Sequence, residues 1–269
     1  MTPSTTPAGP EWRTAVSEIR DDVPFLHGYD LGEAAEQGVA FPAIVLLAAT
    51  GEMPNRDQAA MMNAILVLTA AHGISPSGAI ARILASCGVP LQVAVAGSTL
   101  STGDNHGGSG EQLSKAMYAA VAEHGDDLDR AAAAVVEGCL AEYGFVPGYG
   151  HPMHTSGDPR APLLLGLAER HNVAGKFVAL AIAVSAELER RRGKPIPLNA
   201  TGAIAAVLSD LGVPWQFGRA LISVARAATV GALALEEVER ERRWRMVASG
   251  PDVVYDGEPP RPLPEQWRS

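Results

Sequence analysis

Three histidines stand at breaks in an otherwise apolar chain. His72 follows an alanine-rich helical stretch, His106 lies between GDN and GG, and His151 lies within GYGHP. Histidine titrates near neutral pH and either ring nitrogen can donate or accept, so a histidine on a glycine-flanked turn can exchange protons with a substrate. Taken singly, each is more often a structural histidine, but three on separate breaks favour an active site.

Two arginines have the types of neighbours that an anion site needs. Arg160 follows Asp158 and Pro159, where the aspartate can cap a helix and the proline can occupy its first turn, which leaves Arg160 able to face the preceding loop. Arg226 lies inside the apolar stretch ISVARAATVGALAL. Because an unpaired buried charge is costly, we expect Arg226 to face either a nearby acid or an anionic ligand.

Other kinds of site fit the sequence less well. His151 and His154 are three residues apart in a proline-containing loop, which is not the close pairing typical of zinc ligands, and we expect no metal. GGSGE is not the G-x-S-x-G of a serine hydrolase, and no P-loop is present. The glycine runs also lack the strand context that a dinucleotide-binding fingerprint requires.

Composition predicts an all-α protein. The 269 residues are 47% hydrophobic but only 5% aromatic, and abundant alanine lets helix axes approach closely. The formal charge of −9 disfavours nucleic acid as a partner. No apolar run reaches the ~18 to 20 residues of a membrane span, and the first residues lack a hydrophobic signal core. We expect a cytoplasmic protein in which Cys87 and Cys139 are ordinary buried thiols.

Helix start and stop signals divide the chain into helices that alternate with glycine- and proline-rich breaks. Residues 1–12 are expected to be a flexible arm, and the proline-rich residues 249–269 an extended tail. The pattern predicts helices over residues 41–50, 56–71, 75–87, 91–100, 112–123, 127–142, 161–170, 173–192, 201–211 and from about 215 to 244.

Several motifs resemble those of one family. GYGHPMHTSGDPRA resembles the G-[FY]-G-H…D-P-R-A signature of the citrate synthase superfamily, and HGGSGE resembles its H-G-G-A-x-E. LLAATGEMP, AHGISPSGAIARILAS and LNATGAIAAVLSDLGVP are similar to further motifs of the family, in the same order from about Tyr29 to Arg261. The short chain and the GHP sequence look most like the small bacterial citryl-CoA lyase branch.

The resemblance implies an all-helical fold in which a large domain clasps a smaller one, with the active-site cleft between them. Residues 107–208 would form the small domain, and residues 1–106 and 209–269 the large one. It also implies a homodimer whose substrates are an acyl-CoA and a 2-oxo dicarboxylic acid. The expected reaction makes or cleaves the carbon–carbon bond between them, as when citryl-CoA becomes acetyl-CoA and oxaloacetate.

The resemblance also assigns roles to individual positions. His72, His151, Arg160 and Arg226 match the positions that hold the oxaloacetate portion, and Arg245 matches an arginine that each subunit lends to the other. His106 would hydrogen-bond the thioester oxygen, and His151 would handle the proton of the hydroxyl that becomes the ketone. The loop VPGYG would hold the adenine of coenzyme A, through Val146, Gly148, Tyr149 and Gly150.

One position departs from the family pattern. Thr201 stands where relatives have an aspartate that exchanges a proton with the thioester α carbon. A hydroxyl does not ionise near neutral pH, and the loss of a positioned general base typically costs ~10²–10⁴ in rate. Three hypotheses follow: a water held by Thr201, Asp104 or Glu111 replaces the aspartate; the substrate generates its own enolate by decarboxylation; or the chain is a ligand-binding pseudoenzyme.

Overall fold

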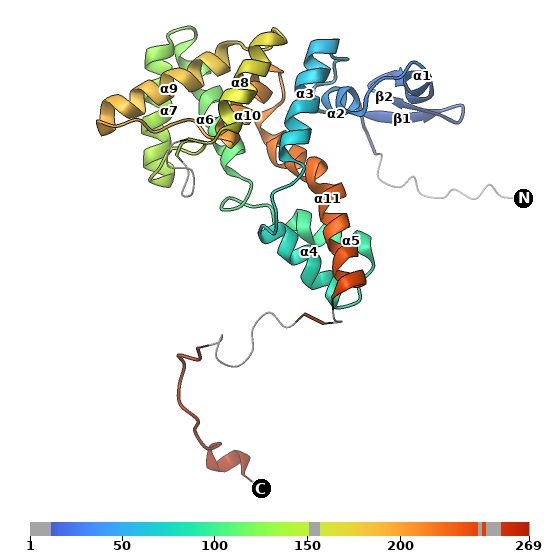
Figure 1. The fold of residues 1–269 in the computed structure, drawn as a ribbon, viewed down its shortest axis with the longest axis vertical. Helices are drawn as coiled ribbons and strands as arrows, with labels where there is room; N and C mark the ends of the chain where they lie inside the picture. The colour runs from blue at the N-terminus through green and yellow to red at the C-terminus, as the bar shows by residue number, and fades with distance from the viewer. Residues whose placement is uncertain (1–11, 151–156, 242–243, 246–253, 269) are drawn as a thin grey trace, which may run out of the picture.

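The computed structural model describes residues 12–150, 157–241, 244–245 and 254–268. This part of the chain is mostly helical, with the eleven α-helices α1 to α11 and one small sheet (Figure 1). The helical class predicted from composition is therefore confirmed. His151, His154 and most of the N-terminal arm lie outside the described residues.

The sheet is one element that the sequence analysis missed, and the short helix α1 (Leu31–Glu36) after it is another. Strands β1 (Ser17–Arg20), β2 (Val23–Leu26) and β3 (Tyr29–Asp30) pair antiparallel in the order β1-β2-β3. Asp21 and Asp22 both have positive φ, as a tight two-residue hairpin turn requires. All four residues of β1 are exposed. This hairpin therefore contributes little to the core, which is why composition gave no sign of it.

Helices α1 (Leu31–Glu36), α2 (Phe41–Thr50) and α3 (Arg56–Thr69) follow the sheet. The Asn55 side chain accepts from the backbone N–H of Gln58, and the Gln58 side chain accepts from that of Asn55. This capping box fixes the start of α3. Helix α3 ends three residues before His72, so the end of this helix determines the position of that histidine.

Helices α4 (Pro76–Ser86), α5 (Leu91–Leu100) and α11 (Gly218–Arg240) pack together at one end of the molecule (Figure 1). Their shared core is small and consists of Ala81, Ala85, Ala94, Val230 and Ala234. Alanine at these positions permits close helix contact, as the alanine-rich sequence predicts. Helix α11 ends at Arg240, four residues before the predicted end.

Five helices form the other lobe, on both sides of the buried helix α10 (Ala200–Asp210). Within α10, every residue from Gly202 to Ser209 is buried. Asp210 at its end accepts from the backbone N–H groups of Phe177 and Val178. The last residue of α10 therefore caps the N-terminus of α9 (Lys176–Arg192). The other three are α6 (Ser109–His124), α7 (Leu128–Tyr143) and α8 (Arg160–Arg170).

The main hydrophobic core joins this lobe to α2 and α3. Leu46 and Met61 from those helices belong to the same buried cluster as Leu113, Leu180 and Leu221. Residues 107–208 contain α6 to α9 and most of α10, whose last two residues lie beyond the predicted boundary, and the separation of a small domain remains a prediction. No helix within the described ranges combines the length and apolar character needed to cross a bilayer.

The prediction for the two cysteines is half wrong. Cys139 is buried in α7, but Cys87 is exposed. Cys87 is the residue that ends α4, where the helix stops packing against its neighbours. The apolar residues around Cys87 in the sequence were therefore not sufficient to predict burial, because the residue lies at a helix end. In the tail, residues 254–268 are exposed and include one short 3-10 turn, Glu265–Trp267.

Candidate active site

A cavity of about 390 Å³ lies where the end of α3 meets the first turns of four other helices. Its wall includes the loop around His106 and the beginnings of α6, α8, α10 and α11. Six of the residues selected from the sequence line it together, although they are far apart in the chain: His72, His106, Gly150, Arg160, Thr201 and Arg226.

The four helix starts make this cavity suited to anions. The N-terminus of a helix carries partial positive charge on its unpaired N–H groups, so negative ligands are stabilised there. Glycines let these helix ends come close together. A Cβ added to Gly110 would lie 3.3 Å from Thr201 Cγ2, and one added to Gly218 would lie 3.7 Å from Glu111 Cβ. A side chain at Gly110 would therefore press on α10, whereas a Cβ at Gly218 would make only an ordinary contact with α6.

Arg226 supplies a half-buried charge to the cavity. Its Nε donates to the carbonyl of Thr69 at 3.4 Å, and among the described residues no carboxylate forms an ion pair with it. Burial lowers the pKa of Arg226, and the nearby Arg160 lowers it further. The sequence left open whether Arg226 faces an acid or a ligand, and this arrangement favours the ligand.

Arg160 is held in a fixed orientation by Asp158. Its Nε donates to Asp158 Oδ1 at 3.0 Å, and a terminal nitrogen donates to Oδ2 at 2.8 Å. Asp158 is 3% exposed and also accepts from the backbone N–H of Ala200. These hydrogen bonds hold the pKa of Asp158 well below its usual range. Asp158 thus connects the arginine to the start of α10.

His106 lies on a tight loop with its ring fixed at one nitrogen. The backbone N–H of His106 donates to the carbonyl of Gly103, and the N–H of Gly103 donates to the carbonyl of His106. Its Nε2 is 3.1 Å from Ser77 Oγ. Burial lowers the pKa of His106, and the charges of Arg226 and His72 lower it further. A neutral ring is suited to hydrogen bonding rather than to carrying charge at neutral pH.

Two carboxylates near Thr201 contact an arginine that sequence reasoning missed. Arg219 Nε is 3.1 Å from Glu111 Oε1, and its terminal nitrogen pairs with Asp104. Glu111 lines the cavity, whereas Asp104 is not among the lining residues. Arg219 lies in the first turn of α11, and no sequence motif distinguished it from other helical arginines.

The loop at residues 146–150 packs against the start of α10. Its Gly148 carbonyl accepts from the backbone N–H of Asn199 at 2.9 Å, and Tyr149 Oη donates to the carbonyl of Ala181 at 2.7 Å. Gly148 has positive φ, and an added Cβ there would lie 2.8 Å from Gly202 Cα. Val146 is buried. Of the four residues assigned to coenzyme A by resemblance, Gly150 alone is in the cavity wall.

Arg245 lies away from the cavity in this single chain. Its Nε donates to Glu237 Oε1 at 2.7 Å and its terminal nitrogen to Oε2 at 2.9 Å. The neighbouring backbone N–H of Trp244 donates to the carbonyl of Ser86. The chain after α11 is thereby attached to the end of α4. His151, which the sequence placed beside the arginines, lies outside the described residues.

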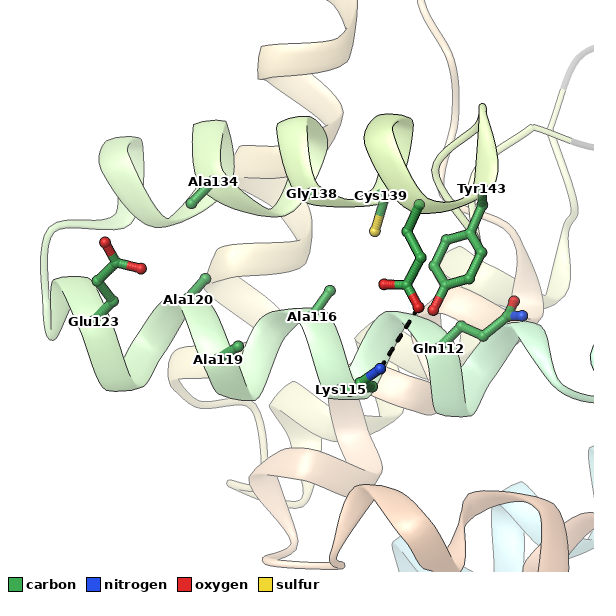
Figure 2. Close-up of a pocket in the computed structure, with 11 residues that line it drawn as sticks. Gln112, Lys115, Ala116, Ala119, Ala120, Glu123, Ala134, Gly138, Cys139 and Tyr143 are labelled. Carbon is green, nitrogen blue, oxygen red and sulfur yellow. Dashed lines mark ion pairs between the residues drawn. The ribbon is translucent and has the colours of Figure 1, made fainter.

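A second hollow, of about 220 Å³, lies between α6 and α7 and contains none of the selected residues (Figure 2). Its wall combines alanine and glycine with polar side chains, including one ion pair of 3.6 Å between Lys115 Nζ and Glu142 Oε1. Burial raises the pKa of the Cys139 thiol to about 11, so it is not a nucleophile near neutral pH. In the part of the chain that the structure describes, no group of three or more histidine, cysteine or carboxylate side chains could hold a metal.

The family follows from comparison with known proteins. Residues 35–247 match the family model described as "Citrate synthase, C-terminal domain". The chain therefore belongs to the citrate synthase superfamily. Among solved structures, it is similar to the citryl-CoA lyase of Hydrogenobacter thermophilus, with 31% identity and a TM-score of 0.87 over 95% of this chain and 98% of that one.

Two further relatives define the extent of the similarity. A Mycobacterium tuberculosis protein named "Putative citrate synthase 2" is 31% identical over 206 residues, which are 74% of this chain and 52% of that protein. The chain thus spans about half the length of the curated relatives it matches. The ATP citrate lyase of Methanothrix soehngenii, solved with citrate and coenzyme A, shares the fold at 20% identity and a TM-score of 0.74, covering 96% of this chain and 43% of that one.

Proposed function

We propose that this protein makes or cleaves the carbon–carbon bond between an acyl-CoA thioester and a 2-oxo dicarboxylic acid, in the manner of a citryl-CoA lyase. One observation carries the proposal. Arg226, half-buried and without a carboxylate partner among the described residues, shares a cavity with Arg160, His72, His106 and the starts of four helices. The relative that matches almost end to end is named a citryl-CoA lyase.

The two arginines are proposed to bind the carboxylates of the 2-oxo acid. A guanidinium can give two parallel hydrogen bonds to a carboxylate, which fixes the orientation of the bound acid as well as its charge. Asp158 keeps the Arg160 fork in place, so little side-chain entropy is lost on binding. His72 also lies in the cavity wall and is proposed to bind the same acid.

His106 is proposed to stabilise the oxygen of the thioester. When the bond next to a thioester breaks, one fragment leaves as an enol and the other as a carbonyl compound, so a donor at the enol oxygen lowers the barrier. A neutral His106 has one ring N–H and can donate this hydrogen bond without first being protonated. His151 is proposed to move the hydroxyl proton, on the resemblance alone.

Coenzyme A is proposed to lie with its adenine on the loop of residues 146–150, and no metal is required. Gly150 extends this loop into the cavity wall, which connects the proposed thioester position with the nucleotide position. The Gly148 carbonyl already accepts one internal hydrogen bond and has a second lone pair for a ligand.

The protein is proposed to act as a homodimer. Large apolar side chains are exposed on α5 and α11, among them Val93, Leu100, Leu235 and Val238, and a second copy would cover them. In that dimer, Arg245 is proposed to reach the cavity of the other subunit. This would break its hydrogen bonds to Glu237, whose carboxylate would keep Arg82 as a partner.

Direct assay of both reaction directions tests this function. The native protein should release acetyl-CoA and oxaloacetate from citryl-CoA, and Arg226→Met should raise KM for the 2-oxo acid in the reverse direction. Glu239→Gln, an exposed change on the same helix, is the matched control. Absence of turnover in both directions, combined with tight oxaloacetate binding, would instead indicate a binding protein.

Thr201 favours one alternative chemistry. A thioester with an α-carboxylate, such as malonyl-CoA, generates its enolate by losing CO₂ and needs no base at position 201. Activity confined to α-carboxylated thioesters would therefore replace the lyase reaction with a decarboxylative condensation.

A further inference from the structure

We infer that Glu111 exchanges the proton with the thioester α carbon, in place of the aspartate that relatives have at position 201, and that Arg219 is its positioning residue. The inference rests on the proposed function and adds to it the group that handles this proton.

Glu111 has the position that this role requires. It lies in the first turn of α6 and lines the cavity with His106 and Arg226. Its side chain is 16% exposed, so it is accessible from the cavity but largely shielded from bulk water. The α carbon of a thioester held by His106 would lie between the start of α6 and the bound 2-oxo acid.

The backbone places Glu111 beside Thr201. Gly110, the preceding residue, packs so closely on α10 that an added Cβ would meet Thr201 Cγ2 at 3.3 Å and the Thr201 carbonyl at 3.6 Å. A carboxylate on α6 at this contact reaches the region that an aspartate on α10 would have served. Thr201 can hold a water between that carboxylate and the substrate.

Arg219 fixes the carboxylate of Glu111. Its Nε forms an ion pair with Glu111 Oε1 at 3.1 Å, a contact that is electrostatic and not a hydrogen bond. This charge holds the carboxylate at one oxygen and leaves the other oxygen for proton transfer. Asp104 binds the same arginine, but its side chain is 69% exposed and does not line the cavity. Geometry thus selects Glu111 of the two acids.

The proton balance of the reaction is complete with this assignment. In cleavage, the substrate hydroxyl gives its proton to the base that the proposed function assigns to it, its oxygen becomes a ketone, and the breaking carbon–carbon bond leaves its electron pair on the thioester fragment as an enolate. The α carbon then takes one proton from the acid form of Glu111, directly or through the water at Thr201. In condensation, the Glu111 carboxylate removes that proton. No oxidant or reductant is needed.

Glu111→Gln in the full-length protein tests the assignment. We expect kcat for citryl-CoA cleavage to fall about 10²- to 10⁴-fold, with KM changed by less than about threefold. Washout of tritium from labelled acetyl-CoA into water should fall in parallel. Adding Thr201→Asp to this variant should raise kcat for citryl-CoA cleavage at least tenfold above that of Glu111→Gln alone. Glu123→Gln, exposed at the other end of α6, is the matched control.

Arg219→Lys tests the positioning role. A lysine keeps the charge but not the planar contact, so we expect the pH profile of kcat to shift while KM remains nearly constant. If Glu111→Gln fails to fold, Glu111→Asp keeps the ion pair and should reduce kcat through its shorter reach.

The outcomes separate the two proposals. An inactive native protein argues against the proposed function itself. An active native protein whose Glu111→Gln variant retains both cleavage and tritium washout overturns the role of Glu111 alone. A larger loss in Asp104→Asn than in Glu111→Gln would also overturn it.

Discussion

Two groups of arginines in this protein have opposite electrostatic surroundings. Arg160 and Arg226 share the cavity, where Arg226 has a single backbone acceptor at 3.4 Å. Arg82 and Arg245 meet at the end of α11, where both donate to Glu237. The first group has more positive charge than the described chain neutralises, whereas the second has a carboxylate at its centre.

The Glu237 cluster shows what a satisfied buried charge requires. The side chain of Glu237 is fully buried, and it accepts from Arg82 Nε at 2.7 Å and from two nitrogens of Arg245. Arg82 also donates to Glu236. The hydrogen bonds from Arg245 lower the pKa of Glu237 and raise that of Arg245. Burial is tolerated here because each charge has its partner within the chain.

At the cavity, Arg226 has no carboxylate partner among the described residues. This difference distinguishes an arginine that stabilises the fold from one that is available to bind a ligand. Burial without an anionic partner lowers the pKa of Arg226, and its neighbour Arg160 contributes in the same direction. A bound dicarboxylate would supply the missing negative charge. Stability and affinity should therefore respond in opposite ways when the two groups are mutated.

Glu237→Gln should have the largest effect on stability. Removing one partner of a buried ion pair leaves uncompensated charge, and we expect the free energy of unfolding to fall by about 3–5 kcal/mol. Urea denaturation followed by circular dichroism measures this. Glu239→Gln on the exposed face of α11 should change it by less than about 0.5 kcal/mol. A loss below about 1 kcal/mol in the buried variant would contradict the structural role.

Arg226→Met should reverse that pattern. The affinity for oxaloacetate should fall about 10- to 100-fold because a hydrogen bond between charged groups is lost. The free energy of unfolding should stay constant or rise, since a desolvated cation without a carboxylate partner is removed. Titration calorimetry and urea denaturation give the two numbers. Arg82→Met should instead destabilise the fold, and similar results for both variants would remove the distinction between the two groups.

Asp158→Asn tests the pair that positions Arg160. Because folding depresses the pKa of Asp158, its stabilisation is present above the unfolded value of about 3.9 and is lost as pH falls through the folded value. We expect the variant to be about 1–3 kcal/mol less stable at pH 7. The difference should shrink as pH falls below 4. A difference that is independent of pH would mean that the ionised carboxylate does not contribute.

The sequence predicted ten of the helices because they depend on local patterns, and six of the residues selected from it line one cavity, while their roles remain predictions. Glycine and proline breaks marked helix ends, and His106, Arg160 and Thr201 stood at those breaks, where four helix starts later met. The family resemblance supplied what spacing could not, namely that these breaks converge. The small N-terminal sheet was missed because its exposed strands have no buried face to give an alternating pattern.

The ion pairs between residues far apart in the chain could not be predicted from the sequence. Arg219 and Glu111 are far apart in the chain, and so are Arg82 and Glu237, and nothing in either helix marks a partner. By contrast, Arg240 and Glu236 are four residues apart on one helix, where a pair can be read from spacing alone, and they form an ion pair. Partner choice over long distance depends on tertiary packing, which is also why the exposure of Cys87 was not predicted.

The smallest expected effect concerns the pH dependence of binding at the cavity. Burial and the positive charges of Arg226 and His72 hold down the pKa of His106. A dicarboxylate would offset those charges and raise that pKa, so binding should take up a fraction of a proton, and affinity for oxaloacetate should increase less than about tenfold as pH falls from 8 to 6. Calorimetry in two buffers of different ionisation enthalpy measures the uptake. His106→Gln should reduce it, and equal uptake in both proteins would assign it to another group and leave the charge balance at His106 unsupported.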